Sequence, residues 1–105
     1  MIERIIEVMI SAAHKIEDHP KKCKNLHGHN YKVRAIGDFN EEEAEIIKKE
    51  INKLDHTYLN KFLGRNATAE LTAKHIHEQI KPKVPGLRII YVWETPECGV
   101  GYSKE

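Results

Sequence analysis

The chain has 105 residues, 40% of them hydrophobic, and a formal net charge of +1. This length supports one domain over residues 1–105 with one core, and the balanced charge argues against a nucleic-acid-binding protein. The N-terminus lacks the apolar segment of a signal peptide, and no run approaches the ~20 apolar residues that cross a bilayer. We therefore expect a cytoplasmic protein that binds neither nucleic acid nor a membrane.

The N-terminal segment, residues 1–14, is compatible with two structures. Its apolar residues fall at helical spacing, which slightly favours a helix, but residues 2–10 would also place isoleucine and valine on one face of a strand. The following segment NYKVRAIGDF, residues 30–39, alternates apolar and basic side chains between two glycines. That alternation predicts a strand.

Two helices and two more strands are expected after this segment. The sequence N-E-E-E that starts at Asn40 has the capping-box pattern and predicts a helix over residues 41–54. A second helix is expected to begin at Asn66 or Thr68 and to stop near Pro82, because proline breaks a helix interior. The segments LRIIYVWE and VGYS near the C-terminus are typical of strands. This order of elements indicates an α+β fold.

Four of the seven histidines lie within the 16 positions from His14 to His29. His27 and His29 are separated by one glycine in a segment that leads into a strand, so their side chains point to the same side with Cα atoms about 6.6 Å apart. His14 would complete a set of three if its element pairs alongside. Three neutral imidazoles suit Zn²⁺, and a catalytic zinc keeps its fourth position for water or substrate.

Cys23 has two interpretations. A thiolate is a strong zinc ligand, so Cys23 and the three histidines could form a closed structural site. Against this, C-x₃-H-G-H is not a zinc-finger spacing, and the lysines on both sides of Cys23 favour a thiolate that acts as a nucleophile or base. In a reducing compartment we expect Cys23 and Cys98 to be free thiols. His19, in a lysine-rich loop, is interpreted as a surface residue.

Two acidic positions are further candidates. Asp55 next to His56 could orient the imidazole for proton transfer, although Asp-His pairs also occur at helix ends as caps. Glu94 follows a predicted buried strand and needs a partner, either a Lys or Arg side chain or the N–H groups of a ligand. His75 and His77 are two positions apart on a predicted helix and cannot share an ion, so we interpret them as surface or core residues.

Five short motifs follow one another between Ser11 and Pro96: S-A-A-H, C-x₃-H-G-H-N-Y, L-D-H-x-Y-L-N, A-T-A-E and W-E-T-P. In this order they resemble the 6-pyruvoyl-tetrahydropterin synthase family. The three residues between Cys23 and His27 are similar to the 6-carboxy-5,6,7,8-tetrahydropterin synthase branch, whereas the biopterin-pathway branch has a longer spacer. One departure is that RAIGDF runs directly toward the first helix, so part of a hairpin common in the family is missing.

The resemblance implies an α+β T-fold (tunnelling fold), in which an antiparallel sheet carries two helices on one face and several subunits close into a barrel. It implies that the N-terminal segment is a strand, that the protein is a homo-oligomer, and that active sites lie between subunits. It also implies roles for eight residues: zinc ligands His14, His27 and His29, catalytic residues Cys23, Asp55 and His56, and substrate-binding residues Glu94 and Thr68.

The activity implied by the resemblance is that of a zinc-dependent lyase. Its substrate would be 7,8-dihydroneopterin triphosphate, and its products 6-carboxytetrahydropterin, acetaldehyde and triphosphate, on the route to queuosine or archaeosine. Two alternatives stay open: a relative that forms a pyruvoyl product or cleaves only the side chain, and a non-catalytic zinc-stabilised subunit. Candidate triphosphate-binding residues are Lys21, Lys22, Lys24, Lys32 and Arg34.

Overall fold

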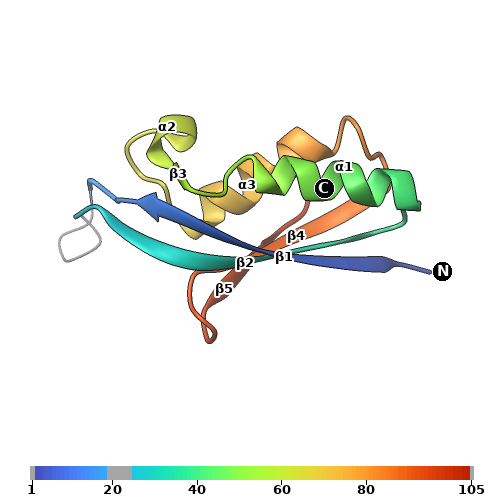
Figure 1. Cartoon of the computed structure of the whole chain (residues 1–105), viewed down its shortest axis with the longest axis horizontal. Coiled ribbons are helices and arrows are strands. Elements are labelled where there is room, and N and C mark those ends of the chain that lie inside the picture. The colour runs from blue at the N-terminus through green and yellow to red at the C-terminus, as the bar shows by residue number, and fades with distance from the viewer. Residues whose placement is uncertain (1, 19–24, 105) are drawn as a thin grey trace.

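The computed structural model describes residues 2–18 and 25–104, which form a five-stranded sheet with helices on one face (Figure 1). The strand order is β3-β1-β2-β4-β5, and every pair is antiparallel except β1 with β3. The strands are β1 (Arg4–His14), β2 (His27–Gly37), β3 (Thr57–Tyr58), β4 (Leu87–Trp93) and β5 (Gly99–Tyr102). The helices are α1 (Glu41–Asn52), α2 (Asn60–Leu63) and α3 (Ala69–Ile80). The predicted α+β class is confirmed.

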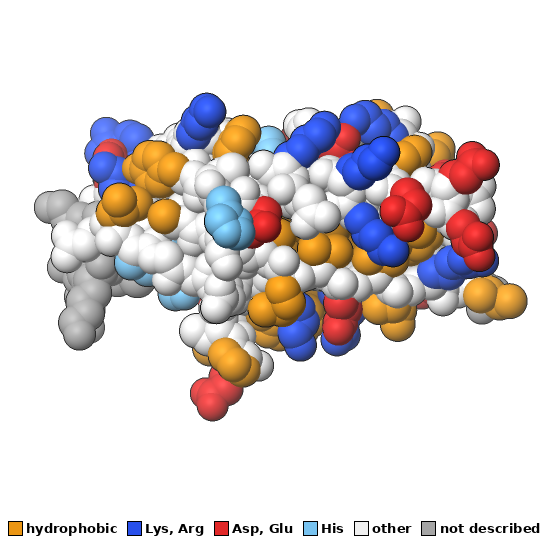
Figure 2. All heavy atoms as spheres, viewed as in Figure 1, with side chains coloured by type: hydrophobic (Ala, Val, Ile, Leu, Met, Phe, Trp, Pro, Cys, Tyr) orange, Lys and Arg blue, Asp and Glu red, His pale blue; other side chains and the backbone are white. Residues whose placement is uncertain are grey.

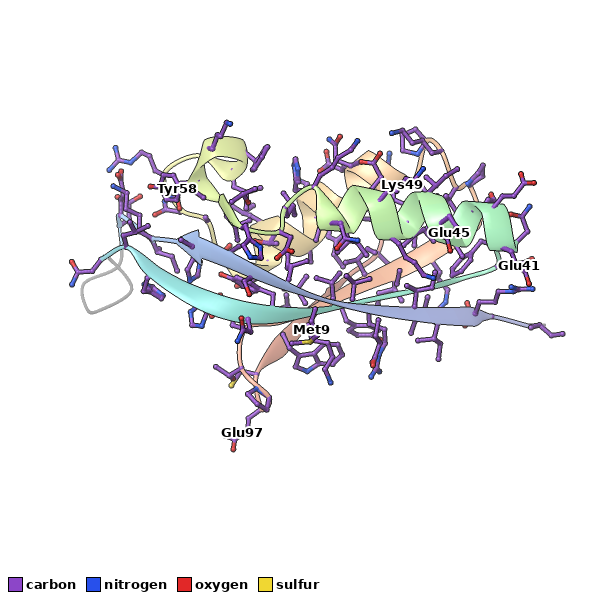
Figure 3. All side chains as sticks on the ribbon, viewed as in Figure 1. Met9, Glu41, Glu45, Lys49, Tyr58 and Glu97 are labelled. Atoms are coloured by element: carbon purple, nitrogen blue, oxygen red, sulfur yellow. The ribbon has the colours of Figure 1, made fainter. Side chains whose placement is uncertain are left out.

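The N-terminal segment is a strand, as the resemblance implied and against the slight preference of its apolar spacing. β1 pairs with β2 along its whole length, from Arg4 opposite Gly37 to His14 opposite His27. The spacing of apolar residues favoured a helix because it counts Ile5 and Met9, which are exposed on the face of the sheet that the helices leave uncovered. Figure 3 shows Met9 on that side. Backbone pairing with β2, rather than the spacing of the apolar residues, therefore determines the structure of this segment.

The two long helices, α1 and α3, each follow a residue whose side chain caps the helix N-terminus. Asn40 and Glu43 form the predicted capping box of α1, with the Asn40 side chain accepting from the Glu43 backbone N–H at 2.8 Å. α1 ends at Asn52 rather than at Leu54, because the chain turns there to reach β3. α3 is capped by Thr68, whose hydroxyl accepts from the Leu71 N–H at 3.2 Å.

Two short elements, β3 and α2, were not predicted. β3 has two residues and pairs in parallel with Ala12 and Ala13 of β1. α2 is a single turn with no side-chain cap, so the expected pair of helices is extended by a third. The buried side chain of Leu59 lies between these elements and holds them to the core. Elements this short do not contain enough residues to show a repeating pattern of apolar side chains in the sequence.

The core lies between the sheet and the helices α1 and α3. Its largest fully buried apolar side chains come from β1, β2, β4, α1, α3 and the loops beside them: Ile10, Tyr31, Val33, Ile47, Ile51, Leu59, Ile76, Ile80, Leu87 and Ile90. Outside this core, Figure 2 shows acidic and basic side chains interspersed over the α1 end of the molecule. None of the described helices is both long and apolar enough to span a membrane.

The opposite face of the sheet carries the basic side chains of β2. Because strand residues alternate, Lys32 and Arg34 point away from the side to which His29 and Tyr31 point. The Lys32 Nζ and the Arg34 Cζ lie 5.4 Å and 5.0 Å from the ring centroid of Trp93, and Arg34 also pairs with Glu7. These two triphosphate candidates therefore face away from the histidines of their own chain.

The capping box gives a test of α1. Replacing Asn40 with Ala removes the acceptor for the Glu43 N–H, and we expect the free energy of unfolding to fall by about 1 kcal/mol in urea titrations. Asn52→Ala, at the exposed other end of the same helix, is the control and should change stability much less. Equal effects of the two substitutions would contradict the cap.

Candidate metal and substrate site

The register of β1 against β2 gathers three histidines at one end of the sheet. His14 lies opposite His27, and Ala12 lies opposite His29, so all three imidazoles are on the helix-facing side. One nitrogen from each ring lies within 4.8 Å of the others. His14 is buried, while His27 and His29 are partly exposed. The predicted set of three is therefore brought together and is able to hold a metal ion.

Backbone carbonyls fix which nitrogens face the centre of this cluster. His14 Nδ1 lies 2.6 Å from the Ala67 carbonyl oxygen, and His27 Nδ1 lies 2.6 Å from the Asn25 carbonyl oxygen. A carbonyl only accepts, so each Nδ1 carries the proton and donates it. Each neutral ring then has its lone pair on Nε2. These two Nε2 atoms lie 3.0 Å apart, a spacing that two lone pairs tolerate only with a proton or a metal ion between them.

The donor set fits a zinc ion. Zinc–nitrogen bonds of about 2.0–2.1 Å in a tetrahedron place ligand nitrogens about 3.3 Å apart, close to the observed separation. Carbonyl partners on the outer ring nitrogens are the usual support of metal-binding histidines. Burial, together with the neighbouring rings of His14 and His27, lowers the pKa of His29, while Glu94 opposes the shift. Burial thus favours the neutral, ligating form of His29.

Glu94 and Thr68 line a cavity of about 360 Å³ at the start of α3. Glu94 directly follows Trp93, the last residue of β4, whose registered partner on β2 is Lys32. In residues 2–18 and 25–104 no Lys or Arg lies within ion-pair distance of Glu94, so the alternative of a basic partner is not found there. Thr68 already accepts the cap bond, so its hydroxyl proton can be donated to a ligand.

The Asp55 and His56 side chains are in contact at the edge of β1. His56 Nδ1 lies 3.0 Å from Asp55 Oδ1, which also accepts the Ser11 backbone N–H at 2.8 Å. The Ser11 N–H, and after it His56, lowers the pKa of Asp55. The carboxylate therefore stays ionised and orients the imidazole with Nε2 outward. His56 has a positive φ of 58°, a conformation that few non-glycine residues adopt.

Among the described residues, the dyad of Asp55 and His56 is not joined to the three histidines of its own chain. The His56 side chain is 80% exposed and borders a cavity of about 500 Å³ on β1 and β2, which His29 also borders. No hydrogen bond or ion pair in the described part of the chain connects the dyad to the histidine cluster. Cys23, Lys21, Lys22 and Lys24 lie outside the described residues, as does His19.

Three residues of the site were missed by the sequence analysis. Tyr31 is fully buried beside the cluster, with its ring centroid 5.8 Å from that of His14 and 5.5 Å from that of His29. Its position two residues after His29 was the available signal. Ser11 and Ala67 act through backbone groups, for which the sequence gives no signal. His77, as expected, is a core residue and packs on Tyr102.

The Asp55 carboxylate gives a pH-dependent prediction. Its pKa is depressed in the folded protein, so its contribution to stability is present at neutral pH and is lost as the pH falls below about 4. We expect the stability difference between wild type and Asp55→Asn to shrink as urea titrations move from pH 7 to pH 3. Asp38→Asn, at an exposed carboxylate, should not reproduce this. A constant difference would contradict the Ser11 bond.

Comparison with known proteins gives a consistent result. The 6-pyruvoyl tetrahydropterin synthase family matches residues 5–105. A 6-carboxy-5,6,7,8-tetrahydropterin synthase of Synechocystis sp. is 33% identical over 114 residues, covering 91% of this chain and 88% of that protein. The fold is similar to 6-pyruvoyl tetrahydropterin synthases of Caenorhabditis elegans (TM-score 0.84, 20% identity, 99% and 96% coverage) and Plasmodium falciparum (TM-score 0.69, 17% identity, 97% and 98% coverage). The chain therefore has the T-fold and belongs to the 6-pyruvoyl tetrahydropterin synthase family of lyases.

Proposed function

We propose that the protein is a zinc-dependent 6-carboxy-5,6,7,8-tetrahydropterin synthase. It converts 7,8-dihydroneopterin triphosphate to 6-carboxytetrahydropterin, acetaldehyde and triphosphate, for queuosine or archaeosine precursors. The observation that carries this proposal is the pair of facing Nε2 atoms of His14 and His27, whose spacing calls for a proton or a metal ion between them, together with the Glu94 carboxylate, which has no basic partner among the described residues. The name of the Synechocystis relative supports the choice of product.

Glu94 and Thr68 bind the pterin in this proposal. The Glu94 carboxylate accepts hydrogen bonds from the ring N–H and the amino group of the pterin, and the Thr68 hydroxyl contacts the ring from the start of α3. Glu94 is near enough to His29 to act on it electrostatically, and we propose that a pterin anchored at Glu94 directs its side chain toward the three histidines. His14, His27 and His29 would hold the zinc, which supplies Lewis-acid polarisation of the side-chain oxygens.

Asp55 and His56 move protons in this proposal. Asp55, kept ionised by the Ser11 N–H, holds His56 Nδ1 and leaves Nε2 to accept or donate a proton during elimination and carbon–carbon cleavage. Cys23, between two lysines, is the second acid or base. Since the dyad is exposed and not joined to the histidines of its own chain, we propose that it serves the metal centre of another subunit in a homo-oligomer.

The two alternatives differ in observable ways. A relative that forms a pyruvoyl product or cleaves only the side chain would use the same pterin-binding carboxylate but release other products. A non-catalytic subunit whose zinc is closed by Cys23 would unfold when the metal is removed, and its thiol would resist alkylation while zinc is bound. The catalytic proposal expects a folded metal-free protein with an accessible thiol.

Product analysis tests the proposed activity. Zinc-loaded protein incubated with 7,8-dihydroneopterin triphosphate should give carboxytetrahydropterin and acetaldehyde by mass spectrometry. Cys23→Ala should abolish the products, and Glu94→Gln should lower kcat/KM at least tenfold because a charged hydrogen-bond acceptor is lost. Glu97→Gln, at the exposed β4–β5 turn (Figure 3), is the matched control and should retain activity.

Other outcomes assign the protein differently. A pyruvoyl product, or a pterin without its side chain, would move it to the first alternative. If the protein still holds zinc but does not turn over this substrate, the enzyme proposal for this substrate is contradicted. Unfolding on chelation together with no turnover would favour the zinc-stabilised subunit.

Subunit complementation tests the sharing of the site. His27→Ala removes a metal ligand, and His56→Ala removes the proton-transfer group, so each variant alone should be inactive. When the two variants are unfolded, mixed and refolded together, mixed oligomers pair an intact metal centre with an intact dyad, and part of the wild-type activity should return. A mixture as inactive as its components would show that both groups must act within one chain.

A further inference from the structure

Tyr31 has a buried hydroxyl with no hydrogen-bond partner in the described part of the chain. Its side chain is fully buried, and its Oη forms no hydrogen bond with any residue in 2–18 or 25–104. Buried polar atoms in native proteins nearly always have a partner, because leaving one unpaired is unfavourable. Packing explains the ring of Tyr31, but it does not explain the oxygen, since phenylalanine would fill the same space.

The surroundings of Tyr31 belong to the proposed site. Along β2 the residue stands two positions after His29, on the same face, and its ring also approaches that of His14 edge-on. On the neighbouring strand, Glu94 directly follows Trp93, which forms the last registered pair of β2 and β4 with Lys32. The negative charge of Glu94 acts on both Tyr31 and His29. Tyr31 thus links the metal-binding histidines to the carboxylate that would anchor a pterin.

The Glu94 carboxylate acts electrostatically on Tyr31, but within the described residues the two side chains form no hydrogen bond. The carboxylate lines the cavity at the start of α3, where its oxygens are available to the N–H groups of a ligand. An acceptor from outside the chain would satisfy Tyr31 without occupying Glu94. In the proposed reaction, the space between the histidines and Glu94 holds oxygen atoms. These belong either to a metal-bound water or to the side chain of the pterin.

We propose that Tyr31 is a further binding residue of this site, whose hydroxyl donates a hydrogen bond to an oxygen held between the three histidines and Glu94. The inference rests on the proposed function for the identity of the pterin, but not for the metal. The two sources of the oxygen, a water on the metal or a substrate oxygen, share one chemistry. They are separated by measuring metal binding and pterin binding independently.

The test compares Tyr31→Phe with the control Tyr102→Phe, which removes a hydroxyl from the partly buried ring against His77. Three quantities are measured: the free energy of unfolding of the metal-free protein in urea, the zinc Kd by competition with a chelator, and the Kd of the zinc-loaded protein for neopterin, a fluorescent oxidised pterin. We expect Tyr31→Phe to leave the metal-free protein at least as stable as wild type, since no protein hydrogen bond is lost and an unpaired buried hydroxyl is removed. One of the two Kd values should rise about tenfold.

Each outcome decides the role of Tyr31. A weaker zinc Kd identifies a metal-bound water as the acceptor, and a weaker neopterin Kd with unchanged zinc affinity identifies an oxygen of the pterin. Lower stability of the metal-free variant with both Kd values unchanged would show a bond inside the protein and overturn the proposal, as would no change in any quantity. If wild type neither binds neopterin nor turns over 7,8-dihydroneopterin triphosphate, the proposed function fails, and the zinc Kd alone then decides Tyr31.

Discussion

The register of β1 on β2 is the constraint on which the site depends. In a strand pair, a slip of one residue turns every side chain to the other face. Such a slip would leave His14 on the uncovered side of the sheet, away from His27 and His29. The register is held by the apolar side chains of Ile10 and Ala12, which are buried under the helices only in the observed alignment. The metal site is therefore specified by the same burial that stabilises the fold.

Much of this arrangement could be predicted from the sequence, for identifiable reasons. The spacing of His27 and His29 fixes them on one face of a strand, and Asn40 carries a capping pattern that needs no tertiary information. The choice between strand and helix for β1 could not be made from its own residues, because Ile5 and Met9 are exposed on one face and blur the alternation. That choice needed the resemblance to a known family, and the structure confirms it.

The parts that could not be predicted depend on backbone groups and on tertiary contacts. The Ser11 N–H that holds Asp55 and the Ala67 carbonyl that holds His14 would be present with almost any side chain at those positions. Asn66 and Thr68 were equal candidates to begin α3, and tertiary structure decides between them. The Asn66 side chain is engaged by Asp18, which leaves Thr68 to cap the helix. Sequence patterns describe side-chain types, whereas this site is arranged by main-chain hydrogen bonds.

The bond from His14 to Ala67 limits what evolution can place at position 14. The imidazole leaves one nitrogen available to a metal ion and donates the proton of the other to a carbonyl that precedes the capping residue of α3. A cysteine or an ionised aspartate can bind a metal, but neither has a proton left to donate to a carbonyl oxygen. Either replacement would preserve a ligand and lose the bond to the Ala67 carbonyl, leaving the backbone bonds of Lys15 with Ala67 and of Glu17 with Arg65 to join the start of α3 to the end of β1. In the proposed metal site, histidine at position 14 therefore meets two requirements, one chemical and one architectural.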